Sequence, residues 1–144
     1  MQALSAPHPN ETLLEAGRYD YWLSGADAGV KEPYTLHRTP KGETLLRAQR
    51  LATAYQTQIA VQVRWAAGDG LMSHPQQVRV QWQSELAGQV QQAEAEYQIN
   101  GGRLVGQVVA DGVTTQLDQI LPENALISPL VRFTQGPVIA VLLA

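Results

Sequence analysis

The chain of 144 residues contains no cysteine and only two lysines, and charged residues make up 16% of it. The absence of cysteine excludes disulfide frameworks, zinc–thiolate sites and thiol nucleophiles, and it fits a reducing compartment. This charge content is below the roughly one quarter that is usual for a soluble domain. Glutamine takes the place of charge and predicts a sheet surface that is polar but largely uncharged. The glutamines concerned are Gln56, Gln58, Gln62, Gln76, Gln77, Gln81, Gln83, Gln89, Gln91, Gln92 and Gln98.

The sequence also lacks basic clusters and long apolar runs. The net charge is −3 and the arginines are scattered, whereas a nucleic-acid-binding surface needs several phosphate contacts on one face. We therefore expect no nucleic-acid partner. A membrane-spanning helix needs about 18 or more consecutive apolar residues, and residues 1–10 have neither the basic start nor the apolar core of a secretory signal. These absences predict a soluble, cytoplasmic protein with no membrane span.

Length and composition predict one domain. A chain of this size buries about 68–70% of its unfolded surface, so it needs no disulfide or metal to fold. Residues 1–10 have two prolines and no periodicity, which is typical of a loose arm. Residues 10–17 fit either one helical turn capped by Asn10 or a lead-in to the first strand, and we prefer the lead-in. The expected organisation is an N-terminal arm over residues 1–17 and a single β domain over 18–144.

Alternation of apolar and polar residues dominates the rest of the chain. It is clearest at 58–65 and 77–83, where valine, isoleucine and tryptophan alternate with glutamine and arginine. Residues 43–56 fit either a helix or a strand, and the preceding turn at 39–42 favours a strand. Further strands are expected at 18–24, 30–37, 92–99, 104–108 and 113–117.

The connections between these strands are short. Asn100–Gly101 predicts a type I′ hairpin, and Asp111–Gly112 predicts another tight turn. A loop is expected over residues 24–29. Pro33 has no N–H to donate, so its strand should lie at an edge of the sheet or carry a bulge. Short loops join only antiparallel neighbours, so the predicted fold is all-β: an antiparallel meander of about eight strands in a strongly curved sheet or incomplete barrel.

The C-terminal part has a different character. Residues 121–133 fit an irregular or short helical segment, and residues 138–144 form an unbroken apolar run. Two explanations compete for this run. Either it packs inside the concave sheet as a plug, or the chain is the front part of a longer protein and the run belongs to a larger structure.

No spacing of residues indicates a catalytic or metal site. His8, His37 and His74 have no second ligand at i+2 or i+4, so we interpret them as surface histidines and expect no metal or cofactor. No serine has the strand–turn–helix setting of a nucleophile. Glu94 and Glu96 share a sheet face about 7 Å apart, and among so many glutamines we interpret them as solvated surface rather than an acid–base pair. No catalytic residue is assigned.

The aromatic residues are the candidates for ligand binding. Trp65 and Trp82 end the two clearest strands on their apolar sides, and Tyr34 also lies on an apolar side; core packing is the simpler explanation for all three. Trp22 differs because polar residues share its side of the strand. It is either a platform for a sugar ring or acyl chain, or a residue that the C-terminal run covers.

Several segments resemble a known kind of domain. They are residues 19–25, 28–29, 34–42, 121–122, 129–132 and 136–139. They resemble uncharacterised bacterial glycolipid-binding-like domains, in which curved antiparallel strands form a barrel or half-barrel around a groove. The resemblance implies a bacterial protein that holds an apolar or amphipathic ligand inside a curved sheet. It assigns no functional residue, because that family has no settled activity.

Three functional hypotheses follow. The first is a non-enzymatic domain that binds a lipid, glycolipid or other amphipathic small molecule, with Tyr34, Trp65 and Trp82 as apolar walls and Trp22 at the rim. The second is a structural or assembly module, such as a homo-oligomer, in which the C-terminal run pairs with another chain. An enzyme ranks third, because its polar cluster would have to be assembled from distant strands.

Overall fold

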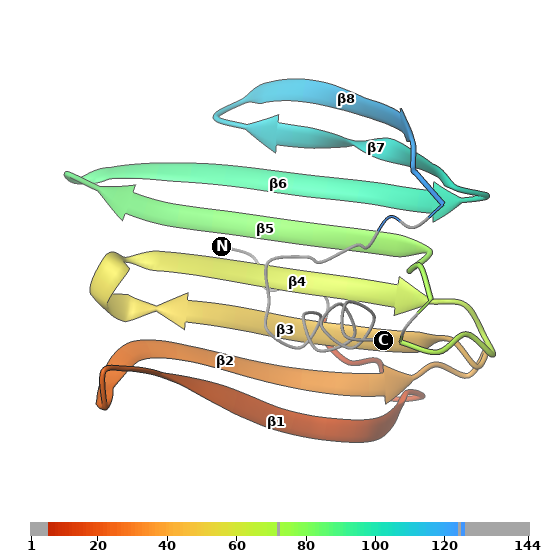
Figure 1. The fold of residues 1–144 in the computed structure, drawn as a ribbon, viewed down its shortest axis with the longest axis horizontal. Helices are drawn as coiled ribbons and strands as arrows, with labels where there is room; N and C mark the ends of the chain where they lie inside the picture. The colour runs from red at the N-terminus through yellow and green to blue at the C-terminus, as the bar shows by residue number, and fades with distance from the viewer. Residues whose placement is uncertain (1–5, 72, 124, 126–144) are drawn as a thin grey trace.

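The computed structural model describes residues 6–71, 73–123 and 125, which form one antiparallel sheet of eight strands (Figure 1). The strands follow one another in chain order, and the sheet is curled but not closed, since β1 and β8 do not pair. This confirms the predicted all-β meander. The strands are β1 (Thr12–Leu23), β2 (Ala26–Arg38), β3 (Thr44–Ala52), β4 (Thr57–Trp65), β5 (Gln77–Leu86), β6 (Gln89–Asn100), β7 (Arg103–Ala110) and β8 (Val113–Ile120), with a short 3-10 turn η1 (Thr53–Tyr55) between β3 and β4.

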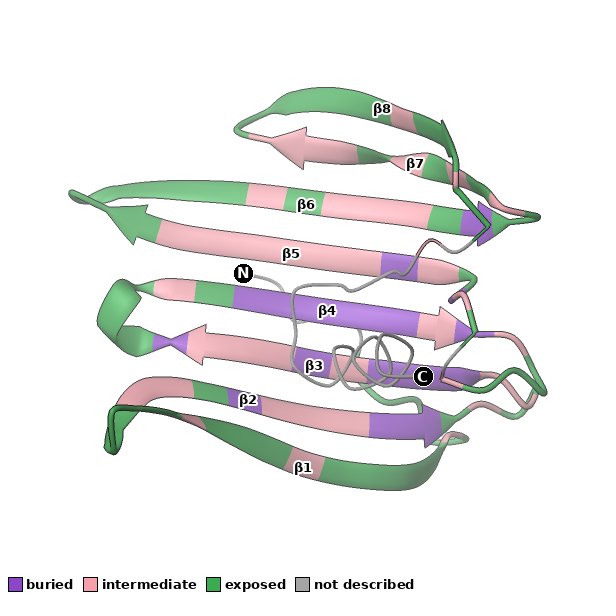
Figure 2. Ribbon diagram, in the orientation of Figure 1, coloured by how far each residue is buried: buried purple, intermediate pink, exposed green. Residues whose placement is uncertain are grey.

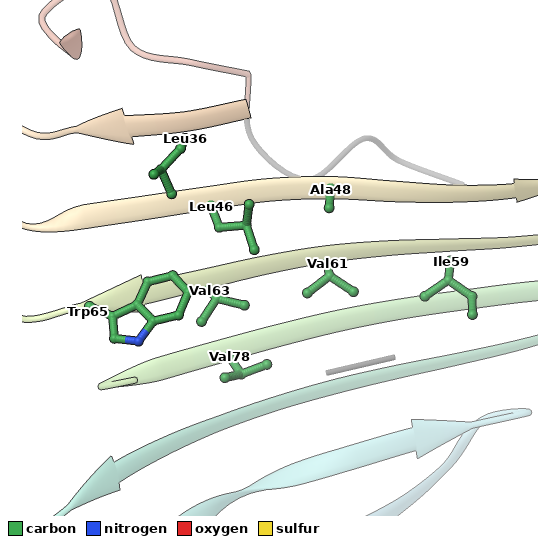
Figure 3. Close-up of a cluster of buried hydrophobic side chains, with 8 residues drawn as sticks. All are labelled: Leu36, Leu46, Ala48, Ile59, Val61, Val63, Trp65 and Val78. Atoms are coloured by element: carbon green, nitrogen blue, oxygen red, sulfur yellow. The ribbon is translucent and has the colours of Figure 1, made fainter. Parts of the chain in front are cut away.

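The alternation in β4 and β5 divides the sheet into two faces. Val61 pairs with Val80 and Val63 with Val78, so their side chains lie on one face, here called the apolar face. The opposite face, called the polar face, carries the intervening glutamines, arginines and glutamates. The hydrophobic core lies on the apolar face of β2 to β5 (Figure 3). Its buried members are Leu36, Leu46, Ala48, Ile59, Val61, Val63, Trp65 and Val78.

The centre of the sheet is buried on both faces (Figure 2). Ala60 and Gln62 belong to the polar face of β4, yet they are 1% and 6% exposed. The prediction that Gln62 is an exposed surface glutamine is therefore wrong. Ala6 and Pro7 lie near Ala60, where they line a groove of about 220 Å³ with polar-face residues of β2 and β3. Part of the N-terminal arm thus packs against the polar face.

The first strand is longer than the sequence suggests. It begins at Thr12 instead of residue 18, so most of the segment assigned to the arm or lead-in belongs to the sheet. The loop expected over 24–29 is also shorter. Ser24 and Gly25 alone make the turn, with φ angles of 50° and 82°, and β2 starts at Ala26. Two-residue turns with positive φ match the twist of the strands that they join.

Two local predictions need correction. The turn assigned to Asn100–Gly101 is centred one residue later, on Gly101 and Gly102, because Asn100 still pairs with Arg103. Pro33 lies in an internal strand, between β1 and β3, and no bulge accompanies it. The pairing between β2 and β3 is absent at residues 32–33 and resumes at Tyr34 in the same register. The sheet thus accommodates the missing N–H of Pro33 by a local gap in the β2–β3 pairing. The strand expected from the ambiguous segment 43–56 is confirmed as β3.

Two glycines within strands pair with a tyrosine of the neighbouring strand. Gly17 of β1 pairs with Tyr34, and Gly106 of β7 pairs with Tyr97. A β-carbon on Gly17 would meet the ring of Tyr34, whereas one on Gly106 would meet the carbonyl oxygen of Glu96 and the Cα and Cβ atoms of Tyr97. The ring of Tyr34 therefore covers the backbone of Gly17, an arrangement that offsets the low strand propensity of glycine. The C-terminal segments over 126–144, including the apolar run, lie outside the described residues.

Candidate functional site

The four aromatic residues singled out in the sequence do not form one pocket. Tyr34, Trp65 and Trp82 all lie on the apolar face. Trp82 pairs with Ile59, whereas Trp65 is six residues further along β4, so the two tryptophans are about 20 Å apart along the strand direction. Trp22 lies at the hairpin end of β1, opposite Asp27, and 68% of it is exposed.

Trp65 belongs to the core. It is 4% exposed, and its indole N–H donates to the carbonyl oxygen of Ser73 at 3.2 Å. A tryptophan held in this way closes one end of the core and does not present a surface. Trp82, in contrast, is only half-buried against the same cluster.

Beyond the core, the apolar face continues across β5 to β8 as a half-buried band. Ile99, at the end of β6, is 8% exposed, and the other side chains of this band are half-buried (Figure 2). Its large members are Trp82 and Tyr97. Tyr97 pairs with Val78, and Val78 is four residues before Trp82 in β5, so the two rings are about 13 Å apart along the strand direction. Between them the band carries alanines. Its half-buried members are Val80, Trp82, Ala93, Ala95, Tyr97, Leu104, Val108, Ala110 and Leu117.

Tyrosines of the apolar face have raised pKa values. Burial raises the pKa of Tyr97 to about 12. The hydroxyl of Tyr34 donates to the carboxylate of Glu15 at 2.5 Å, and this hydrogen bond raises the pKa of Tyr34 to about 12. The ring of Tyr34 also stacks on Tyr19, with centroids 5.4 Å apart. Both hydroxyls therefore stay protonated near neutral pH and are hydrogen-bond donors there.

A buried ionic network lies where β1, β2 and β3 meet on the apolar face. Glu32 is fully buried and accepts a hydrogen bond from the Tyr21 hydroxyl at 2.7 Å and from Arg50 Nε at 3.1 Å. Arg50 also donates to the Tyr21 oxygen at 3.0 Å, and its guanidinium lies 5.5 Å from the centre of that ring. Burial, followed by the hydrogen bond to Glu32, raises the pKa of Tyr21.

The sequence contained a signal for this network. Glu32 alternates in phase with Val30 and Tyr34, and Arg50 alternates in phase with Leu46 and Ala48, so each charge falls on the apolar side of its strand. Opposite charges at such positions in neighbouring strands indicate a buried pair.

A second ion pair fastens the N-terminal arm to the polar face. Arg47 donates to both carboxylate oxygens of Glu11, at 2.8 and 3.0 Å, and the two side chains are only 11% and 7% exposed. His37 lies beside this pair, with its Nδ1 3.5 Å from Arg47 Nη1. His37 is 6% exposed, so its interpretation as a surface histidine is wrong.

The Glu11 pair predicts acid sensitivity. The hydrogen bond from Arg47 lowers the pKa of Glu11 below its ordinary 4.5, so the folded state favours the ionised carboxylate. Stability from this group is then present above pH 4.5 and is lost as the pH falls through the lowered pKa. We expect Glu11→Gln to reduce the free energy of unfolding by about 1.5–3 kcal/mol at neutral pH, and urea titrations should show this gap closing in acid.

Asp118 provides the control for this measurement. Its pKa is also lowered, by a hydrogen bond from Arg103, but the pair is well exposed. Solvent screens such a pair, so Asp118→Asn should change stability little at any pH, and less still in high salt. Equal pH profiles for the two variants would show that Glu11 contributes no more than a surface charge.

The polar face has a second groove, of about 460 Å³, at the β5–β6 and β7–β8 hairpins. Gln81, Gln83 and Glu94 line it, together with Asp111 and valines. The side-chain oxygens of Gln81 and Gln83 are buried there without a hydrogen-bond partner among the described residues. The groove is therefore rich in acceptors.

The remaining titratable candidates form no reactive cluster. Arg79 lies between Glu94 and Glu96, at 3.4 and 3.6 Å, so these carboxylates share one cation on the polar face. Nε2 of His74 lies 2.6 Å from the carbonyl oxygen of Ala125. Within residues 6–71, 73–123 and 125, no three histidine, cysteine, aspartate or glutamate side chains are grouped so that they could hold a metal ion.

No family model, curated protein or solved structure matches this chain. In the described part of the chain, no helix is long and apolar enough to cross a membrane.

Proposed function

We propose that this domain binds an amphipathic small molecule, such as a lipid or glycolipid, on the half-buried band of its apolar face. The observation that carries the proposal is the incomplete burial of this band, next to a core that is fully buried. Interiors of proteins are close-packed, and an unfilled apolar surface is a favourable site for an apolar ligand.

The arrangement of large and small side chains supports an elongated ligand. Trp82 pairs with Ala93, and Tyr97 lies four residues further along β6, so an acyl chain that lies along β6 would contact an aromatic ring at each end and pass over the small Ala95 between them. The protonated Tyr97 hydroxyl provides a donor for a polar head group. Trp65 and Tyr34 are less suited to contact a ligand than the sequence suggested, because Trp65 is in the core and the Tyr34 hydroxyl is bonded to Glu15.

A binding titration tests the proposal. Native mass spectrometry of the purified protein is expected to reveal a co-purified amphiphile, and lysophosphatidylcholine below its micellar concentration is expected to bind to stripped protein. Trp82→Ala removes an aromatic contact and should weaken binding at least tenfold, which corresponds to about 1.4 kcal/mol. Ala95→Phe should also weaken it, because the added ring occupies the place of the ligand.

Trp22→Ala is the matched control, since Trp22 is a strongly exposed tryptophan outside the band. It is expected to leave the affinity unchanged, and circular dichroism should show that all three variants keep the fold. If stripped protein binds no lysophosphatidylcholine, or if Ala95→Phe binds it as tightly as the parent does, the band is not a ligand site.

A further inference from the structure

The two edges of the open sheet differ in how they are protected. β1 has register shifts between Leu13 and Glu15 and between Asp20 and Trp22. Such irregularities interrupt the row of backbone groups that another strand would need. β8 pairs with β7 through all eight residues without a shift, and it contains no proline, lysine or glycine. Of the features by which proteins normally prevent edge-to-edge pairing, β8 therefore lacks proline, lysine and bulges, and its one charged residue, Asp118, is paired with Arg103 of the same chain.

The outward backbone groups of β8 follow from its hairpin. Asp111 and Gly112, with φ of 47° and 81°, make a two-residue turn closed by Ala110 and Val113. In a turn of this kind the closing pair is hydrogen-bonded, so odd-numbered residues of β8 bond toward β7. The backbone N–H of Leu121, the next odd-numbered residue after β8, donates to the carbonyl oxygen of Gly102 at 2.7 Å, which agrees with this assignment.

The even-numbered residues of β8 consequently direct their N–H and C=O groups away from β7. They are Thr114, Gln116, Asp118 and Ile120. No described strand pairs with this edge, and every residue of β8 except Leu117 is exposed. Ile120 is 87% exposed and Val113 67%.

We infer that β8 is a self-association edge, where a second copy of this chain adds its own β8 in antiparallel orientation about a two-fold axis. Such an axis perpendicular to the sheet joins two copies with their apolar faces on the same side. The two sheets then become one, and the half-buried band continues across the junction. This inference is independent of the proposed ligand.

Side-chain chemistry selects the register centred on Leu117. There Leu117 meets its own copy at a non-hydrogen-bonded position, where side chains approach most closely. Asp118 then lies opposite Gln116 of the second copy, and its charge stays paired with Arg103, at 2.6 Å, in its own chain. A register centred on Asp118 would instead place two carboxylates opposite each other, which is unfavourable.

The first experiment blocks the outward backbone. Gln116→Pro removes an N–H that makes no bond to β7, so the monomer keeps its ladder, whereas Gln116→Thr retains the N–H and suits a strand. In sedimentation velocity, the parent and Gln116→Thr should shift with concentration from 15.7 kDa toward twice that mass. Gln116→Pro should remain monomeric, with a dimer at least tenfold weaker.

The second experiment tests the register and does not depend on proline. Because the chain has no cysteine, Leu117→Cys introduces a single thiol that faces its own copy across the two-fold axis. Mild oxidation should yield a covalent dimer, and Thr115→Cys, which would face residue 119 instead, should not. A parent that stays monomeric at high micromolar concentration, or crosslinking that is equal at 115 and 117, overturns the inference.

Discussion

Arg50→Met is expected to destabilise the protein by about 3–5 kcal/mol, because it removes a cation from a carboxylate that is fully buried. Glu32 is 0% exposed, and Arg50 bonds to it directly and through Tyr21. Breaking a buried pair leaves a charge that water cannot solvate, and this cost exceeds what the intact pair contributes. Urea-induced unfolding at neutral pH measures the change.

Two further variants separate the charge from the packing. Arg18→Met removes a cation from an exposed pair with Asp20 and should cost less than about 0.5 kcal/mol. The double variant Glu32→Met, Arg50→Met removes both charges and should regain most of the stability lost by Arg50→Met, since well-packed apolar side chains commonly replace a buried pair without loss. If Arg50→Met and Arg18→Met cost the same, the network is no more than a surface interaction.

The alternation of residue types was sufficient to predict the fold but not the depth of burial. In β4 and β5, valine and tryptophan alternate with glutamine because one side of each strand faces the core and the other does not, and this pattern predicted both strands and their pairing. Gln62 and Ala60 share the polar phase, yet both are buried. Ala6 and Pro7 lie near Ala60, and such proximity between distant segments leaves no local pattern in the sequence.

The positions of the aromatic residues show the same limit. Their phase predicted that Tyr34, Trp65 and Trp82 share one face, and they do. The distance between them depends on the register of β4 against β5, which aligns Trp82 with Ile59 and separates it from Trp65. Register is fixed by turn lengths and packing, so a pocket built on all three rings could be suggested from the sequence but not placed.

The turn between β6 and β7 was predicted to within a residue. Gly101 and Gly102 follow Asn100 directly, and either neighbouring pair can adopt the positive φ angles that a type I′ turn needs. The pairing of Asn100 with Arg103 selects the pair Gly101–Gly102. Pro33 is a different case: β2 pairs with β1 on one side and β3 on the other, and the β2–β3 ladder is interrupted at the proline without a change of register.

Leu46→Ala is expected to cost about 2–5 kcal/mol, because Leu46 is 0% exposed and packs within the core of β2 to β5. The loss combines the transfer of the missing methyl groups with the cavity that remains, and β3 lies between two paired neighbours that limit its collapse. Leu86→Ala, at a leucine that is 68% exposed, provides the control and should stay within about 0.5 kcal/mol.

The same substitution also tests where the stability of the sheet resides. The buried residues concentrate in β2 to β4, whereas β7 and β8 contribute only half-buried or exposed side chains (Figure 2). Native-state hydrogen exchange should therefore show β7 and β8 opening at lower free energy than β3 and β4, and Leu46→Ala should lower protection mainly in the latter. If protection is uniform across all eight strands, the half-buried band is as tightly held as the core. It would then leave no space for the proposed ligand.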